Sequence, residues 1–112
     1  MLPLPYRLRR SEEIKQVRQH GQSRHHPLLV MVYYPNNRPM SRFAFIASKH
    51  VGNAVARNRA KRLLREAVRH YLPMIEPGWD CVFIARRATS EAAYAAVDAA
   101  VAQLLARAQL TG

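Results

Sequence analysis

The sequence predicts an α+β fold in which helices pack on a small, mostly antiparallel sheet. Three short apolar runs rich in β-branched and aromatic residues predict strands, and three segments with apolar residues three and four positions apart predict helices. Their order along the chain is helix, strand, strand, helix, strand, helix, with room for one extra short strand. Because 49% of the 112 residues are hydrophobic, we expect a single domain over residues 1–112 with its own core.

The amino-terminal residues 1–10 are expected to form a basic extended arm. Pro3 and Pro5 oppose a helix there, and three arginines supply the charge. Ser11 is then a suitable N-cap, and the two glutamates after it lie in the first turn, where the helix macrodipole favours negative charge. We therefore expect the first helix to start at Ser11 and to stop at Gly21.

Two strands are expected next, at 28–34 and 42–48, with a proline-containing loop between them. Because this loop is short, we expect the two strands to pair as an antiparallel hairpin. The first strand is apolar on both faces, which indicates either a central strand or one whose second face binds a ligand.

The second helix is expected to begin after an Asn53 cap and to end near Leu72. A third strand at 79–85 is suited to lie parallel to the strand at 42–48, and such connections are right-handed in about 98% of cases. A final helix is expected from Thr89. Its apolar stripe is expected to face the core and consists of Tyr94, Val97, Val101, Leu104 and Leu105.

The second helix carries an unusual concentration of positive charge between residues 56 and 69. At about 100° per residue, its cations fall on one side and its apolar residues on another. Four cations follow one another at intervals of four residues, where like charges destabilise an isolated helix: Arg57, Lys61, Arg65 and Arg69. Together with the net charge of +11, this pattern predicts a polyanionic partner.

Nucleic acid suits this basic face better than a membrane surface does. Arginine predominates over lysine, and it pairs with phosphate oxygens and stacks on bases, whereas interfacial helices usually carry a broad apolar face. These residues do not distinguish DNA from RNA as the partner, because a basic helix is also able to enter a DNA major groove. Four aromatic residues suit either the stacking of RNA bases or a core, namely Tyr33, Tyr34, Phe43 and Phe45.

No catalytic centre is expected in this chain, and no metal or other cofactor is expected to be bound by the protein itself. The seven acidic residues are scattered, with Glu12 and Glu13 as the adjacent pair, so no carboxylate cluster is predicted. His25 and His26 would point to opposite faces of a strand. The single cysteine, Cys81, lies in an apolar run, and no segment has the length of a membrane span, which predicts a soluble cytoplasmic protein.

Residues 45–66, FIASKHVGNAVARNRAKRLLRE, resemble the signature of the bacterial ribonuclease P protein subunit, S-K-K-x-G-N-A-V-x-R-N-R-x-K-R-x-x-R-E. The pair Arg7-Leu8, the helix ending at Gly21 and the strand from residue 79 are also similar to that family, so the resemblance covers nearly the whole chain. It implies an α+β fold like the second domain of ribosomal protein S5. It also implies a left-handed crossover through the basic helix, against the general rule.

The resemblance implies a subunit of an endoribonuclease that removes the 5′ leader from precursor tRNA. A catalytic RNA would hold magnesium and perform the chemistry, while the protein binds that RNA and the leader. Neither a membrane nor an obligate protein partner is expected. The positions that match RNA-contacting residues of the family are Ser48, Lys49, Asn53, Arg57, Asn58, Arg59, Lys61, Arg62 and Arg65, and the basic face adds Arg69.

A leader cleft is expected between the first helix and the sheet. Its candidate residues are Ile14, Val17, Arg18, Tyr33, Tyr34, Phe43 and Phe45. The chain departs from the family here, because Ile14 and Arg18 stand where Phe or Tyr is common, and His50 stands in place of a usual lysine. Three alternatives remain: a structural RNA binder of ribosomal type, an architectural DNA-binding protein and an autonomous nuclease. A cleavage assay with and without a catalytic RNA separates them.

Overall fold

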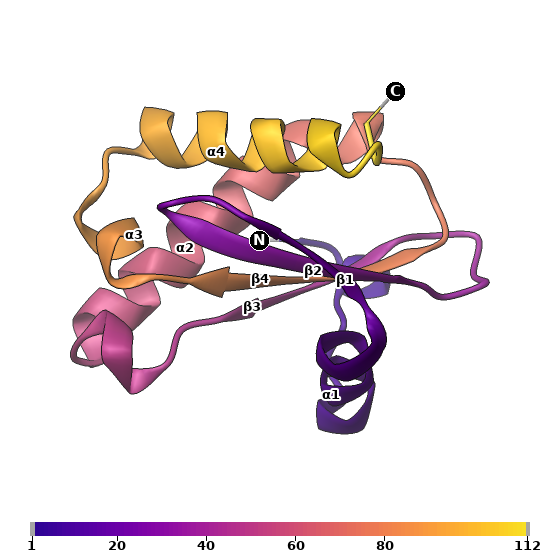
Figure 1. Ribbon diagram of the computed structural model, residues 1–112, viewed down its shortest axis with the longest axis horizontal. Helices are drawn as coiled ribbons and strands as arrows, with labels where there is room; N and C mark the ends of the chain where they lie inside the picture. The colour runs from indigo at the N-terminus through magenta and orange to yellow at the C-terminus, as the bar shows by residue number, and fades with distance from the viewer. Residues whose placement is uncertain (1, 112) are drawn as a thin grey trace.

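A four-stranded mixed sheet forms the centre of the computed structural model, which describes residues 2–111 (Figure 1). The strands are β1 (Gln22–His25), β2 (Leu29–Pro35), β3 (Arg42–Ile46) and β4 (Trp79–Ala85), arranged in the order β1-β2-β4-β3. The helices are α1 (Ser11–His20), α2 (Ala54–Tyr71), α3 (Arg87–Glu91) and α4 (Tyr94–Arg107). The predicted α+β class is confirmed, and β1 is the extra short strand.

The expected hairpin between the strands at 28–34 and 42–48 is wrong, because β4 lies between β2 and β3. β2 pairs with β4 in antiparallel fashion, with Met31 opposite Phe83. The two strands that are apolar on both faces, β2 and β4, therefore take the two central positions, where both faces are covered or half-covered. The loop after β2 passes the start of β4, and the Asn36 N–H donates to the Gly78 carbonyl oxygen at 2.9 Å.

β3 and β4 pair in parallel, with Phe45 opposite Phe83, and α2 connects them. This confirms that the strands on either side of the basic helix are parallel neighbours. The left-handed course of the connection stays an expectation from the family resemblance. α2 begins as predicted, because the Asn53 side chain accepts the Ala56 N–H at 2.9 Å.

The sheet has a core on each face (Figure 1). α2 and α4 cover one face, where Met31, Phe83 and Leu64 are fully buried. α1 covers one end of the other face, where Val17 packs on Val82. The side-chain alternation of the strands divides the apolar residues between the two cores.

Three local expectations are corrected. Ser11 is the first residue of α1 and not its cap, which is Arg10. The final helix is interrupted at Ala92 and Ala93, so that α3 and α4 are separate. The stripe of α4 is buried as predicted except at Tyr94, the first residue of the helix, which is 41% exposed and whose hydroxyl donates to the Asp98 carboxylate one turn away.

The amino-terminal segment packs along the sheet and does not extend away from it. Residues Leu4–Tyr6 form a 3₁₀ turn, and Leu2 and Leu8 are buried. The Leu8 N–H donates to the Phe43 carbonyl oxygen at 2.8 Å, so the segment continues the sheet beyond β3. This contact places the basic residues of the segment beside the edge strand.

Candidate nucleic-acid interface

The basic face of α2 is held outward by the packing of its opposite face. Ala60, Leu64, Ala67 and Val68 are buried, and the residues between them carry the cations. We call Arg57, Lys61, Arg62, Arg65 and Arg69 the basic face. Small alanines let the helix lie close to the sheet and α4, so the buried residues set the direction in which the cations project.

Most cations of the basic face have no acidic partner within the described residues. Within residues 2–111, Arg69 pairs with Glu66 at 3.4 Å, and no ion pair forms at Arg57, Lys61, Arg62 or Arg65. The Arg69 pair is largely exposed and therefore weak. Four guanidinium or ammonium groups thus remain available to an anion, on one side of a single helix.

The turn before α2 adds further exposed polar groups next to this face. The Ser48 hydroxyl accepts the His50 N–H at 3.3 Å, and Lys49 begins a 3₁₀ turn. Gly52 follows with a φ of 143°, a conformation that L side chains rarely adopt, and Asn53 then caps the helix. The exposed residues Ser48, Lys49 and Asn53 thus lie together at the amino end of α2.

Arg59 has a different environment from the other matched cations. Its Nε donates to the Ser90 carbonyl oxygen at 2.9 Å, and its Nη2 donates to the Ala92 carbonyl oxygen at 3.4 Å. These carbonyls lie at the end of α3, so Arg59 satisfies the end of that short helix and joins it to α2. Asn58 is exposed beside it.

A second candidate surface is the part of the sheet that α1 leaves uncovered. Ile14 of α1 is half-buried against this face, and Arg18, one turn later, is exposed. Beyond the helix the floor is formed by three half-buried side chains, Val30, Ile46 and Ile84. We call this half-buried apolar surface, together with the side of α1 that carries Ile14 and Arg18, the α1 groove. An apolar surface on this side of the sheet was predictable from the sequence, because β2 and β4 are apolar on both faces.

Three of the predicted cleft residues lie on the opposite face of the sheet. Tyr33 and Phe43 are buried in the core under α2 and α4, and the Phe45 ring stacks on Phe83 at 5.7 Å. Residues two apart on a strand share a face, so Phe43 and Phe45 lie on the α2 side of the sheet, where they line a hollow at the edge of β3 together with Ile14. A role of these residues in leader binding stays a prediction. Tyr34 does lie on the α1 side, with its ring 6.4 Å from that of His20.

The edge of β3 joins the two surfaces. A surface hollow of about 280 Å³ is lined by Ile14 of the groove, by Phe45 and by Arg65 of the basic face. Arg9 of the amino-terminal segment also lines it. No acidic side chain lines this hollow among the described residues, so it joins the basic face to the α1 groove without negative charge.

The sequence model of the Ribonuclease P family matches residues 2–109 of the chain. The chain belongs to the ribonuclease P protein family. The ribonuclease P protein component of Roseiflexus castenholzii is 47% identical over 104 residues, which cover 92% of this chain and 85% of that protein. The corresponding protein of Dehalococcoides mccartyi is 45% identical over 104 residues, covering 93% of this chain and 85% of that protein.

Solved structures of ribonuclease P proteins share the fold. The Staphylococcus aureus protein superposes with a TM-score of 0.84 at 25% identity, covering 96% of this chain and 98% of that one. The Thermotoga maritima protein gives a TM-score of 0.81 at 28% identity, covering 90% and 96%. The chain is therefore a protein component of the tRNA-processing endoribonuclease, a ribonucleoprotein in which its partner is the ribonuclease P RNA.

One further cation of this ribonuclease P protein, Arg86, was not singled out from the sequence as a site residue. Arg86 follows β4, and its Nη2 lies 3.5 Å from Nδ1 of His25 on β1. His25 shares a face with Val30, so both side chains lie at the end of the α1 groove farthest from α1. The sequence contained one signal for Arg86, because this cation directly follows the apolar strand β4.

The metal-ligating residue types of this ribonuclease P protein lie apart from one another in the part of the chain that the structure describes. Among residues 2–111, no three His, Cys, Asp or Glu side chains are grouped closely enough to hold a metal ion. Among the helices of the same residues, none has the length and apolar character that crossing a bilayer requires.

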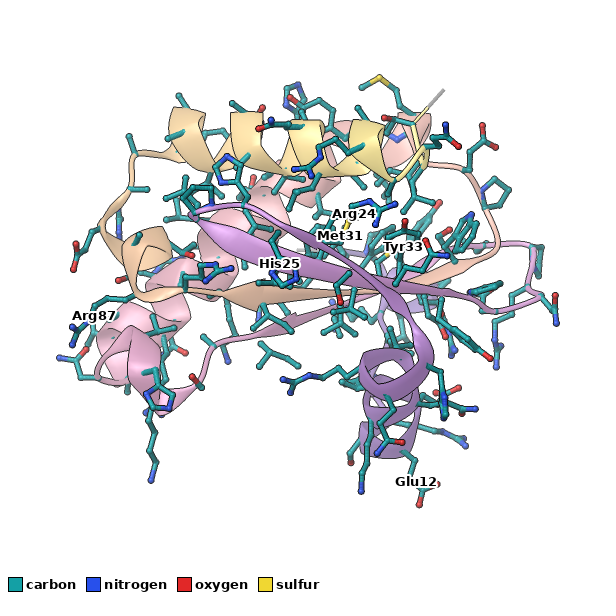
Figure 2. The ribbon with its side chains drawn as sticks, viewed as in Figure 1. Glu12, Arg24, His25, Met31, Tyr33 and Arg87 are labelled. Carbon is teal, nitrogen blue, oxygen red and sulfur yellow. The ribbon has the colours of Figure 1, made fainter. Side chains whose placement is uncertain are left out.

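Figure 2 shows charged side chains spread over the outer surfaces of the helices.

Proposed function

We propose that the chain binds the ribonuclease P RNA through the basic face of α2 and the 5′ leader of precursor tRNA in the α1 groove. The observation that supports RNA binding by α2 is the set of four cations on one side of this helix that have no acidic partner within the described residues. Arginine there is suited to phosphate oxygens, which it contacts in pairs. Lys49, Asn53 and Asn58 extend this contact at the amino end of the helix.

The shape and composition of the α1 groove support the second half of the proposal. Its floor is apolar, its wall carries Arg18, and its far end carries Arg86 and His25. Single-stranded RNA is bound by surfaces of this kind, where bases lie on apolar side chains and cations contact the backbone. The absence of aromatic groups at Ile14 and Arg18 favours apolar packing over stacking on α1.

We also propose a division of labour between the protein and the RNA. In this proposal the protein supplies positive charge and a binding surface, and the RNA holds the magnesium that performs the chemistry. The protein thereby increases the affinity for precursor tRNA at low magnesium. We also place the protein in the cytoplasm, which is consistent with the free, buried thiol of Cys81.

A cleavage assay at low magnesium tests the function as a whole. Precursor tRNA is incubated with the protein alone, with a bacterial ribonuclease P RNA alone, and with both. We expect cleavage that is much faster in the mixture than with either component. Cleavage by the protein alone would contradict the proposal, and binding without any gain in rate would assign it a structural role.

A salt titration tests the basic face. Replacing Arg62 and Arg65 with alanine removes two phosphate contacts, so the slope of log affinity against log salt should fall by about 1.4 to 1.8. Arg24→Ala is the control, because Arg24 is also a surface cation but lies on β1, over the Tyr33 ring. An unchanged slope in the double variant would exclude these two arginines from the interface.

A further inference from the structure

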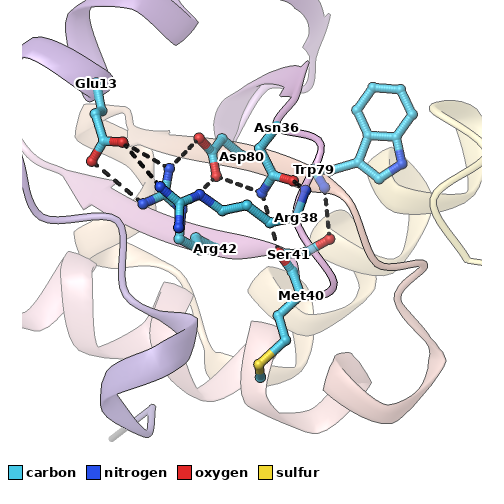
Figure 3. A network of polar contacts seen from close by, with 8 residues as sticks. All are labelled: Glu13, Asn36, Arg38, Met40, Ser41, Arg42, Trp79 and Asp80. Atoms are coloured by element: carbon cyan, nitrogen blue, oxygen red, sulfur yellow. Dashed lines mark hydrogen bonds and ion pairs between the residues drawn. The ribbon is translucent and has the colours of Figure 1, made fainter.

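Arg42 connects α1 to the sheet through two carboxylates (Figure 3). Its Nε and Nη2 donate to the two carboxylate oxygens of Asp80 on β4, at 2.9 and 2.7 Å. The same Nη2 donates to Oε2 of Glu13 on α1 at 3.0 Å. One guanidinium on β3 thus links the neighbouring strand to a helix that is distant in sequence.

On the sheet side of this connection, Asp80 is buried and makes further hydrogen bonds. Asp80 is 6% exposed, and it also accepts a hydrogen bond from the Asn36 side chain at 2.9 Å. Asn36 in turn donates to the Met40 carbonyl oxygen at 3.2 Å, which ties the loop between β2 and β3 to the same group. The hydrogen bond with Asp80 raises the pKa of Arg42 above its ordinary value, against the effect of burial, and Glu13 raises it further.

On the α1 side of this connection, a few side chains hold the helix to the sheet. α1 has ten residues, a length at which an isolated helix is marginal in water, so its position is determined by its contacts with the sheet. Val17 is its buried apolar contact, and within residues 2–111 Glu13 is the side chain of α1 that hydrogen-bonds to the sheet. Glu13 and Val17 lie one turn apart on the same side of the helix.

This side of α1 is not the side that forms the groove wall. Ile14 follows Glu13 directly and is rotated by about 100° from it, and Arg18 lies one turn beyond Ile14. Glu13 and Arg42 therefore fix one side of the helix to the sheet, while Ile14, packed on the sheet, and the exposed Arg18 lie on the adjacent side, next to the α1 groove. A shift of α1 about the Glu13 contact changes the distance between Arg18 and the floor.

We propose that the Glu13–Arg42 ion pair positions α1 and thereby sets its distance from the apolar surface to which we assign the leader. Glu13 is a positioning residue in this scheme and makes no contact with RNA. The inference rests on the proposed function, because it concerns the surface to which we assign the leader. A partly buried, charge-assisted contact suits such a role, since it is both strong and directional.

Glu13→Ala tests the inference without disturbing the Arg42–Asp80 pair, so no buried charge is left unpaired. Glu12→Ala is the matched control. Both changes remove one carboxylate from the first turn of α1, and so they alter the macrodipole interaction and the net charge alike. Glu12 is exposed and points away from the sheet (Figure 2), whereas Glu13 also has Arg38 Nη2 at 4.0 Å.

The readout is the preference of the holoenzyme for a long leader. Protein is combined with a bacterial ribonuclease P RNA, and Kd is measured for precursor tRNA with a long leader and with a one-nucleotide leader. We expect Glu13→Ala to reduce the ratio of the two affinities by about fivefold or more, the low end of coupling between linked sites. Glu12→Ala should leave the ratio at its wild-type value.

Each outcome separates the inference from the proposed function. No preference for the long leader in the wild-type holoenzyme would contradict the proposed function itself. A wild-type preference that Glu13→Ala retains as fully as Glu12→Ala would overturn the positioning role. Equal weakening of both substrates by Glu13→Ala would also overturn it, because the effect would then be one of general stability. The melting temperature of each variant is measured alongside as the folding control.

Discussion

Arg65 of the basic face lies over the ring of Phe45, with its guanidinium carbon 5.9 Å from the ring centroid. The ring itself stacks on Phe83 of the adjacent strand at 5.7 Å. A cation on α2 is thereby anchored to the edge of the sheet, beside the hollow that leads to the α1 groove. We therefore expect Phe45 to influence RNA binding indirectly, by holding Arg65 in place.

Phe45→Leu should weaken RNA binding through Arg65. Loss of the ring removes a cation–π contact, so we expect the affinity for ribonuclease P RNA to fall about two- to fivefold. The free energy of unfolding should also fall by about 1 kcal/mol, because the stacking on Phe83 is lost. A double-mutant cycle with Arg65→Ala measures the coupling. If Phe45→Leu weakens binding equally in the Arg65→Ala background, the two residues act independently.

Asp98→Asn should destabilise the contact between α2 and α4. The Asp98 carboxylate accepts hydrogen bonds from the hydroxyls of Tyr71 and Tyr94, and it lies 2.8 Å from Nδ1 of His70. At neutral pH we expect the substitution to lower the free energy of unfolding by about 1 to 2 kcal/mol, as for hydrogen bonds to a charged group. Urea unfolding of both proteins measures this difference.

The destabilisation should depend on pH in a defined direction. Burial alone would raise the pKa of Asp98, but the hydrogen bonds from Tyr71, His70 and Tyr94 lower it below the ordinary value of 3.8. The carboxylate therefore stabilises the folded protein above pH 3.8, and this stabilisation is lost as the pH falls through the lower folded-state value. A difference between wild type and variant that stays constant down to strongly acidic pH would contradict this assignment.

Gly21→Ala should be destabilising although the φ of Gly21 is an ordinary −76°. A Cβ at this position would lie 2.5 Å from the Val17 carbonyl oxygen and 2.7 Å from the Tyr33 carbonyl oxygen. Because both atoms belong to the backbone, α1 would have to move from β2, at a cost of about 1 to 3 kcal/mol. Thermal unfolding measures the effect. A variant with the stability of the wild type would show that this chain connection is pliable.

Cys81 should be unreactive in the folded protein. The thiol, on the central strand β4, is fully buried in the core under α2 and α4, and burial raises its pKa well above the ordinary value. We expect a soluble thiol reagent to modify it at the rate of unfolding, and rapidly in denaturant. Fast modification of the native protein, followed by mass spectrometry, would indicate that the central strands open locally.

Much of the local structure was predictable from the sequence, because its signals are local. Asn53 was recognisable as a cap, and the spacing of Arg57, Lys61 and Arg65 placed them on one face of α2. Ser11 was misjudged by one position because the capping pattern tolerates such a shift. Tyr94 was misjudged because a tyrosine at a core spacing has a hydroxyl that also seeks a partner, here Asp98.

The sequence by itself determined the α+β class, the basic helix, the family resemblance and therefore the kind of partner, since charge and helical period are properties of neighbouring residues. Only the tertiary structure decided that β4 separates β2 from β3, and hence that Tyr33 and Phe43 face the core under α2 and α4. It also decided that Arg42 contacts both Glu13 and Asp80. Strand order and such ion pairs depend on the free energy of long-range pairing, which a local pattern does not encode.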